Sequence, residues 1–297
     1  MTNKKNVLPN LKGLPYGGAW AVENKIYHNA IESVIKHNTS QLAKTDSAEF
    51  LETYHKWFQS SHNISGLETF TKSTCSLGTT ETFDKFYLAH SKKRLRLWKG
   101  EYFYHQIAAR TIFDSFCWMH EAPIQTGDVL IVSVPFADTG NVPADLDQVL
   151  DDCDKHQVPV LIDLAYINLA KDLQIDLSRN CVQVITTSLS KVFPVAHYRI
   201  GMRLTKHIDD DLMIAYEQNQ YVNKFGCGLG IQLMQQFTAD HLHNSYQDRQ
   251  KQLCEQLGLE VSRSVIFGID HTDQHKIYNR GGKTNRLCFA KVWAEDN

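Results

Sequence analysis

The sequence predicts an α/β fold with a mostly parallel central sheet, on the strength of three observations. Two apolar runs, 158–162 and 182–187, have the length and composition of strands that are buried on both faces. Each run ends in polar residues: Asp163 follows the first, and Ser188 and Lys191 follow the second. A helical pattern precedes the first run and would link it to an earlier strand. Because open α/β sheets bind ligands at the C-terminal ends of their strands, we expect a functional site there.

The first half of the chain alternates helical and strand patterns. Apolar residues recur at helical spacing over 24–37 and 47–60, and again after Gly78 as far as residue 88. Strands are expected over 94–98 and 128–134. A helix over 143–156 begins with a proline and early acidic residues, and it joins the strand over 128–134 to the run over 158–162 as a βαβ unit.

The second half changes in character after residue 221. A strand is predicted over 198–204, followed by a long helical stretch over 230–257 and two strands, 262–267 and 286–293. Residues 10–20 are rich in glycine and proline and are expected to form a loop. His241 and His243 lie two residues apart, which points them to different sides of a helix, and no metal site is expected there.

Composition limits the class of protein. With 297 residues, 42% of them hydrophobic, the chain can bury a full core. Its formal charge of -2 gives no reason to expect a nucleic-acid or membrane partner. Residues 1–9 have no apolar core, so no signal peptide is expected. Seven scattered cysteines without a CxxC pair favour a reduced, cytoplasmic location.

The polar residues at the two strand ends suit one cofactor, pyridoxal phosphate. Lys191 would form a Schiff base with its aldehyde. Asp163 would keep the pyridine nitrogen protonated, because a nearby carboxylate favours the charged form. Ser188 and Arg199, eight residues after Lys191, would bind the phosphate through hydrogen bonds.

Three segments in this region share the order and spacing of a known signature. They are Asp163-Leu164-Ala165-Tyr166, Ser188-x-x-Lys191 and Arg199-Ile200-Gly201. Together they resemble the class I/II aminotransferases, which belong to fold type I of the pyridoxal phosphate enzymes. The resemblance implies a large cofactor-binding domain over 46–220 and a small α+β domain from 1–45 and 221–297, shortened at its C-terminus. It also implies an antiparallel strand after Lys191 and a homodimer with its active site at the interface.

The resemblance assigns further residues to the cofactor. A cup before a helix, formed by Gly78, Thr79 and Thr80, would bind the phosphate through backbone N–H groups. The alternative is that Thr79 or Thr80 simply caps the helix. The family places an aromatic ring over the pyridine, for which Tyr102 is the candidate. Tyr104 and His105 are alternatives, and any of the three could be a core aromatic. The cofactor set also includes Ser190.

One motif departs from the family pattern. The Asn-Pro-Thr-Gly of the family falls on residues 137–140, where the asparagine that binds the cofactor's phenolic oxygen is replaced by Ala137 and the proline by Asp138. Tyr166 would still reach that oxygen. Asp138 either compensates for the missing asparagine or caps the turn.

Two positions are implied for the substrate. Arg286, in Arg286-Leu287-Cys288-Phe289-Ala290, resembles the family's arginine that binds the α-carboxylate with two hydrogen bonds. The alternative is an arginine on a surface strand. A glycine-bearing loop near the N-terminus covers the substrate in the family, which suggests Gly17.

These roles predict an aminotransferase of amino acid metabolism or biosynthesis, with an amino acid and a 2-oxo acid as substrates. Lys191, Asp163 and Tyr166 are its expected catalytic residues, with Lys191 as the general base at the α-carbon. The departure at Ala137 keeps a pyridoxal phosphate-dependent decarboxylase, lyase or oxidase open as the alternative. A second alternative is a non-catalytic member of the fold.

Overall fold

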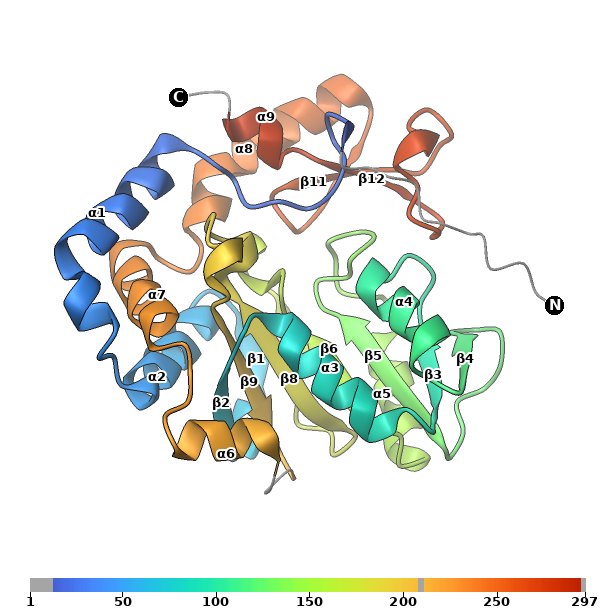
Figure 1. The fold of residues 1–297 in the computed structure, drawn as a ribbon. Helices are drawn as coiled ribbons and strands as arrows, with labels where there is room; N and C mark the ends of the chain where they lie inside the picture. Colours follow the sequence, from blue (N-terminus) through green and yellow to red (C-terminus); the bar gives the residue numbers. More distant parts are fainter. Residues whose placement is uncertain (1–12, 208–210, 295–297) are drawn as a thin grey trace.

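A seven-stranded sheet forms the centre of the computed structural model, which describes residues 13–207 and 211–294 (Figure 1). Its strand order is β2-β9-β8-β6-β5-β3-β4. Pairs from β8 to β4 are parallel, whereas β9 is antiparallel to both of its neighbours, as expected for the strand after Lys191. The strands are β2 (Lys72–Ser76), β3 (Arg94–Leu97), β4 (Ser115–Trp118), β5 (Asp128–Ser133), β6 (Val160–Asp163), β8 (Val182–Ser188) and β9 (Gly201–Thr205).

Helices cover both faces of this sheet. In β5, Val129 and Ile131 belong to the cluster that contains apolar side chains of α3 and α4, whereas Leu130 and Val132 belong to the main core with those of α5. Figure 1 shows α3 in front of the sheet and α5 behind it. Alternate residues are therefore buried on opposite faces, which explains the uninterrupted apolar run. The helices are α3 (Thr79–His90), α4 (Phe103–Thr111) and α5 (Leu146–Lys155).

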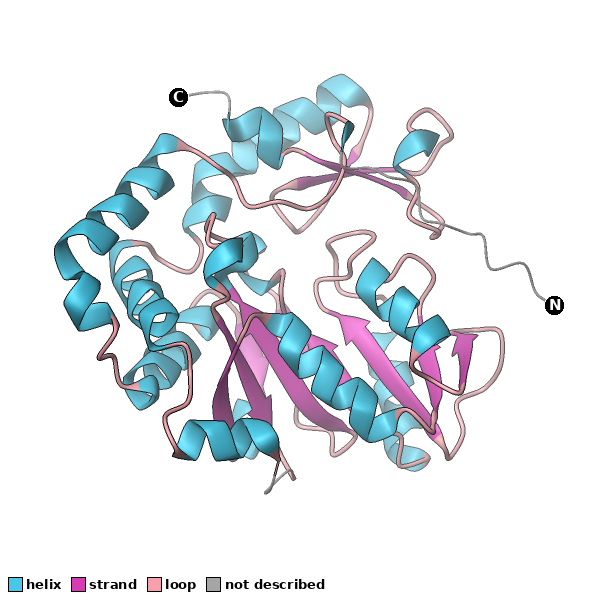
Figure 2. Ribbon diagram, viewed as in Figure 1, coloured by secondary structure: helices cyan, strands magenta, loops and turns pink. Residues whose placement is uncertain are grey.

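A smaller antiparallel sheet lies beyond the C-terminal ends of the central strands, as Figure 2 shows. It consists of β10 (Glu260–Val261), β11 (Phe267–Asp270) and β12 (Asn285–Cys288), with α8 (His241–Leu257) and α9 (Ala290–Ala294) beside it. Three more helices, α1 (Lys25–Leu42), α2 (Ser47–Gln59) and α7 (Lys224–Gln236), pack together at one side. The remaining elements are β1 (Asn63–Ser65), which pairs with β7 (Gln174–Asp176), and α6 (Leu212–Gln218).

The single helical stretch predicted over 230–257 is wrong, because the chain breaks into α7 and α8. Phe237 has an extended backbone, with φ -126° and ψ 134°. Its ring packs 5.3 Å from that of Tyr27 and 5.5 Å from that of Phe193. The Thr238 hydroxyl then donates to Asp240 at 2.8 Å and closes a turn before α8. Tertiary packing of one aromatic ring therefore overrides the local helical pattern.

Both strands predicted near the C-terminus are displaced. The side-chain amide of Gln250 donates to the carbonyls of Ser262, Ser264 and Phe267. The backbone of residues 262–264 therefore bonds to a side chain and not to a neighbouring strand, and β11 begins only at Phe267. At the other end, the predicted strand over 286–293 ends at residue 288, and Trp293 lies in α9, stacked 4.7 Å from Tyr246.

Some predicted boundaries shift, and some fall outside the described residues. The strand predicted over 198–204 begins at Gly201, because 196–198 form a 3-10 turn. Residues 1–12, which include the segment in which no signal peptide is expected and the start of the predicted N-terminal loop, lie outside the described ranges. Within those ranges, none of the helices combines the length and apolarity that a membrane span requires.

A buried cluster of charges joins the neighbouring strands β3 and β5 of the central sheet. Asp128, at the start of β5, is fully buried and accepts hydrogen bonds from Arg94 at 2.6 Å and Arg96 at 3.0 Å. Arg96 is 1% exposed. Burial opposes the charge of Asp128, but the hydrogen bonds from Arg94 and from the Gln125 amide outweigh it and lower its pKa.

Asp128→Asn should lower the free energy of unfolding by about 3–5 kcal/mol at neutral pH, because it leaves a buried guanidinium without its counter-charge. Denaturant unfolding measures this. A lowered folded-state pKa stabilises the protein above the unfolded-state pKa of about 4, and this contribution is lost as the pH falls through the folded-state value. The difference in the free energy of unfolding between the wild-type protein and Asp128→Asn should therefore become smaller at acidic pH. Glu52→Gln, in the exposed pair with Lys56, is the control and should change nothing measurable; an equal effect there would contradict the prediction.

Candidate active site

The strand register brings the predicted site residues to one edge of the sheet. Asp163 of β6 pairs with Thr186 of β8, which places it beside the end of that strand. Ser188, the last residue of β8, pairs with Gly201 of β9, and Gly201 also pairs with Ser76 of β2. The loops after β2 and β8 and the loop before β9 therefore meet at this edge.

Lys191 lies in a 3-10 turn (Leu189–Lys191) immediately after β8. The Ser188 hydroxyl oxygen accepts the Ser190 amide at 3.1 Å and thereby caps this turn. The Lys191 amine donates to the carbonyl of Ala19 at 2.7 Å and lies 6.0 Å from the centre of the Trp20 ring. The turn fixes the backbone of the lysine at the strand end, while the N-terminal segment supplies an acceptor for its amine.

Asp163 is almost completely buried and belongs to a polar chain. One carboxylate oxygen accepts the Ala165 amide at 2.9 Å. The other lies 3.9 Å from Nε2 of His105, whose Nδ1 is hydrogen-bonded to the Tyr87 hydroxyl at 2.6 Å. Burial and then the charge of Asp163 raise the pKa of Tyr87. Asp163 is thus a buried carboxylate with a histidine beside it.

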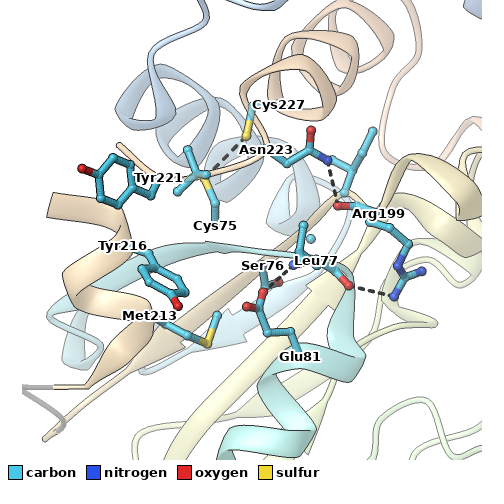
Figure 3. Close-up of a pocket in the computed structure, with 13 residues that line it drawn as sticks. Cys75, Ser76, Leu77, Glu81, Arg199, Met213, Tyr216, Tyr221, Asn223 and Cys227 are labelled. Carbon is cyan, nitrogen blue, oxygen red and sulfur yellow. Dashed lines mark hydrogen bonds between the residues drawn. The ribbon is translucent and has the colours of Figure 1, made fainter. Parts of the chain in front are cut away.

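Arg199 and Gly78 form a cradle at the start of α3. Arg199 adopts a left-handed backbone conformation, and one terminal nitrogen, Nη2, donates to the Leu77 carbonyl at 2.7 Å and to the Thr80 hydroxyl at 2.9 Å (Figure 3 shows the bond to Leu77). A Cβ on Gly78 would stand 2.4 Å from that nitrogen. Within the described residues no side chain caps this helix, so the alternative in which Thr79 or Thr80 caps it is wrong, since the cap position is Gly78.

An apolar cavity of about 110 Å³ lies beside this cradle (Figure 3). Arg199, Leu77 and Glu81 line one side of it, and Cys75 and Cys227, with their sulfur atoms 3.6 Å apart, lie on the other. Neither Lys191 nor Asp163 lines this cavity. It is therefore a neighbour of the predicted site and not its substrate pocket.

Two tyrosines approach Asp163 from different loops. Tyr102 precedes α4 and is partly exposed. Burial, followed by the proximity of Tyr166 and Asp163, raises the pKa of Tyr102, which places the three side chains near one another. The ring of Tyr166 packs edge-on to Phe267 at 5.5 Å, and its hydroxyl makes no hydrogen bond to the described residues. The alternative rings have other contacts: Tyr104 donates to Asp84, and His105 is buried against Tyr87.

Residues 137 and 138, where the sequence departs from the family motif, join the central sheet to the segment that contains β12. Ala137 is fully buried, and its amide donates to the Ser133 hydroxyl oxygen at 2.8 Å. That hydroxyl is in turn hydrogen-bonded to the buried carboxyl of Glu101, whose pKa burial raises. Asp138 accepts the Thr284 hydroxyl at 2.8 Å, and burial raises its pKa. Asp138 therefore bonds to the residue that immediately precedes β12 of the smaller sheet. The sequence predicts two other roles for Asp138, compensation for the missing asparagine or a cap on the turn.

Arg286 lies at the same junction and is almost completely buried, so the alternative of a surface arginine is wrong. Its two terminal nitrogens donate to the carbonyls of Ala137 and, at 2.9 Å, Gly18, and its guanidinium lies 4.2 Å from the centre of the Phe267 ring. Gly17, next to Gly18, is buried, and its carbonyl accepts from Trp20 at 3.2 Å. The N-terminal loop therefore reaches both Arg286 and Lys191.

Sequence reasoning missed three polar residues of this region. The sequence predicts His105 only as an alternative stacking ring or a core aromatic, although it faces Asp163. Glu101 was not singled out, although it directly precedes Tyr102 and organises the Ser133 loop. Arg280 stands beside two glycines in a segment interpreted only as polar, and no local pattern distinguishes it from a surface arginine.

The fold and the lysine site define the class of protein, and comparison with known families gives the particular family. The model of the family described as aminotransferase class I and II matches residues 111–278. Because the match spans more than half of the sequence, this chain belongs to that family. It is an enzyme of the aminotransferase-like type, and members of the family typically use pyridoxal phosphate. A search of curated proteins found no match to this chain.

Solved structures agree on the fold. A double mutant of aspartate aminotransferase from Thermus thermophilus has a TM-score of 0.71 at 13% identity, with 94% of this chain and 87% of that chain covered. Aromatic aminotransferase from Pyrococcus horikoshii has a TM-score of 0.68 at 12% identity, covering 93% and 91%. Histidinol-phosphate aminotransferase from Clostridium acetobutylicum has a TM-score of 0.58 at 15% identity, covering 84% and 81%. The fold is that of the fold type I enzymes.

Gly78→Ala should destabilise the protein by about 2 kcal/mol or more, because φ 72° with ψ -176° is a conformation that only glycine adopts readily. Gly258→Ala is the control. Its φ of 67° and ψ of 37° are ordinary left-handed values with no atom within 4 Å of a new Cβ, and it should cost about 1 kcal/mol. Chemical denaturation gives the free energy of unfolding of both variants. A smaller loss of stability for Gly78→Ala than for Gly258→Ala would contradict the backbone conformation assigned to Gly78.

Proposed function

We propose that this chain is a pyridoxal phosphate-dependent aminotransferase that moves an amino group between an amino acid and a 2-oxo acid, with the cofactor attached to Lys191. The observation that carries the proposal is the meeting of Asp163, Lys191 and Arg199 at one sheet edge, in a chain of this family. Burial of Asp163 and the close contact between Gly78 and Arg199 support it most directly.

The residues fit the cofactor at both of its ends. The cradle of Gly78, Thr80 and Arg199 combines a guanidinium, a hydroxyl and an uncapped helix start, which suit a phosphate. Ser188 and Ser190 add hydroxyls on the adjacent strand end, although these are hydrogen-bonded to each other at 2.8 Å. Asp163 is buried where a protonated ring nitrogen would balance its charge.

When bound, pyridoxal phosphate supplies an aldehyde that condenses with amines and a ring that accepts electrons from the α-carbon. Asp163 would hold the proton on the ring nitrogen. Tyr166, whose hydroxyl has no hydrogen-bond partner among the described residues, would donate to the phenolic oxygen, and Tyr102 would lie against the ring. Lys191 Nζ, released from the aldehyde carbon when the substrate's amine replaces it, would take the proton from the substrate's α-carbon and, as the general acid, return it to that former aldehyde carbon.

Arg286 and the N-terminal loop would position the substrate. Arg286 points two donors toward the carbonyls of Ala137 and Gly18, so its guanidinium is already oriented at the junction where a carboxylate would be bound. The carbonyls of Gly18 and Ala19 contact Arg286 and Lys191 respectively, which supports a role for the loop containing Gly17 in covering the substrate.

The domain division and assembly are part of the same proposal. The central sheet lies within 46–220 and the smaller sheet within 221–297, which supports the predicted large and small domains. A homodimer is supported by exposed apolar side chains near the cradle: Leu77 is 47% exposed, Leu212 59% and Tyr221 76%. None of the seven cysteines forms a disulfide, which is compatible with the cytoplasmic location that we propose.

Lys191→Ala should abolish covalent attachment of pyridoxal phosphate and lower amino transfer by at least about 100-fold, because it removes both the attachment point and the general base. The visible absorbance of the loaded protein, and peptide masses after borohydride reduction, measure attachment; amino transfer is followed with a panel of amino acids and a 2-oxo acid. The control is Lys251→Ala on the exposed side of α8.

The same assay separates the alternatives. Attachment to Lys191 with release of CO2 or ammonia, and without amino transfer, would instead support the decarboxylase, lyase or oxidase. Wild-type protein that does not bind the cofactor at Lys191 would contradict the proposal and support a non-catalytic member of the fold.

Tyr221→Asp should convert a dimer of the wild-type chain into monomer, because it places a charge in an apolar contact. Light scattering after size-exclusion chromatography gives the mass of each protein. Wild-type protein that is monomeric at micromolar concentration would refute the proposed assembly.

A further inference from the structure

Arg280 occupies a turn that is held rigidly between the 3-10 turn Lys276–Tyr278 and β12. The Asn279 side chain accepts the Gly281 amide at 2.8 Å and donates to the carbonyls of Thr284 at 3.0 Å and Gly282 at 3.3 Å. Three hydrogen bonds from one side chain therefore fix the backbone on both sides of Arg280.

This turn packs directly on the loop that follows β5. The Thr284 hydroxyl donates to Asp138, and a Cβ on Gly282 would stand only 2.1 Å from the same carboxylate oxygen. Asp138 follows Ala137, whose carbonyl accepts from Arg286. The turn is thus part of the junction between the two sheets, beside the predicted site for the substrate's α-carboxylate.

The side chain of Arg280 has no hydrogen-bond or ion-pair partner among the described residues. Its Nε is inaccessible to solvent and unbonded, and its guanidinium makes no hydrogen bond or ion pair with any residue in the ranges 13–207 and 211–294. Burial, and then the proximity of Arg286, lower the pKa of Arg280 to about 10, whereas Tyr166 and Asp138 act in the opposite direction. Arg280 therefore remains a cation at neutral pH, close to Arg286 and Tyr166.

A partly buried guanidinium without an acceptor is costly, which points to an anion as its missing partner. Asp138 does not fill that role, because Thr284 occupies one of its oxygens and burial weakens its ionisation. Arg286 differs from Arg280, since each of its two terminal nitrogens already donates one N–H to a carbonyl and keeps one N–H for a ligand. The junction thus holds two guanidiniums with different surroundings, and, among the described residues, that of Arg280 donates to no protein acceptor.

Building on the proposed function, we propose that Arg280 binds a second carboxylate, at the far end of the substrate's side chain, while Arg286 binds the α-carboxylate. The preferred substrates are then acidic amino acids and their 2-oxo acids. A planar guanidinium matches a carboxylate with two parallel hydrogen bonds, and an amide of the same shape cannot provide two acceptors.

The test compares each acidic amino acid with its amide, aspartate with asparagine and glutamate with glutamine, on the protein loaded with pyridoxal phosphate. Arg280→Gln should lower kcat/KM for the acidic member by about 10- to 100-fold, mainly through KM, and leave the amide within about 3-fold. Lys283→Gln, which removes a charge from an exposed position of the same turn, is the control and should leave both unchanged.

A binding measurement without turnover gives an independent readout. Calorimetric titration of the loaded wild-type protein should show tighter binding of succinate than of butyrate, which lacks the second carboxylate. Arg280→Gln should lose this preference while keeping the visible absorbance of the cofactor. An equal loss for acidic and amide substrates would mean that Arg280 binds the α-carboxylate, and no loss would mean that it binds neither; each result overturns the inference.

The outcomes also separate this inference from the proposed function. Failure of the wild-type chain to attach the cofactor or to transfer amino groups would refute the function itself. Wild-type transfer that does not favour acidic substrates, or that keeps its preference in Arg280→Gln, would refute only the role of Arg280.

Discussion

The register of the central sheet is the constraint on which the candidate site depends. Parallel strands end at a common edge, so residues far apart in the sequence become neighbours when their strands pair. Gly201 pairs with both Ser76 and Ser188, which joins the cradle of Gly78 and Arg199 to the turn that carries Lys191. Asp163 reaches the same edge on the adjacent strand. A slip of one residue would turn these side chains into the core.

Cationic side chains lie together at this edge, and they donate hydrogen bonds to uncharged carbonyl oxygens. Lys191 donates to the carbonyl of Ala19, Arg286 to that of Gly18 and Arg199 to that of Leu77. Carbonyl oxygens satisfy hydrogen bonds without cancelling charge, so the acidic group that offsets these cations at the same edge is Asp163. The phosphate and carboxylate of the proposed function are groups that such cations attract.

The junction between the two sheets lies where the sequence departs from the aminotransferase pattern. Ala137 contributes no side-chain polar group, but its amide and carbonyl bond to Ser133 and Arg286. Asp138 bonds to Thr284, which immediately precedes β12 of the smaller sheet. The loop would therefore connect the proposed cofactor end of the site to the proposed substrate end. This arrangement explains how a motif that lacks its usual asparagine remains an ordered part of the structure.

By itself the sequence determined the class of fold, and it predicted the main residues of the candidate site. Apolar runs that end in Asp163 and in Ser188 to Lys191 are typical of strands buried on both faces, and strand ends carry function in such sheets. The spacing from Asp163 to Arg199 was enough to predict the cofactor and the family, and the family match agrees.

Only the tertiary structure decided which distant groups meet. The break at Phe237 follows from the packing of its ring against Tyr27 and Phe193, which no helical periodicity records. His105 of α4 faces Asp163 of β6, and Asp138 bonds to Thr284, because the fold brings together segments that lie 58 and 146 residues apart in the chain. In the same way, whether the Arg280 side chain has a hydrogen-bond partner depends on which segments the fold places around it. Local patterns reflect the energetics of a residue's own helix or strand, whereas contacts between loops arise only when the whole chain has folded.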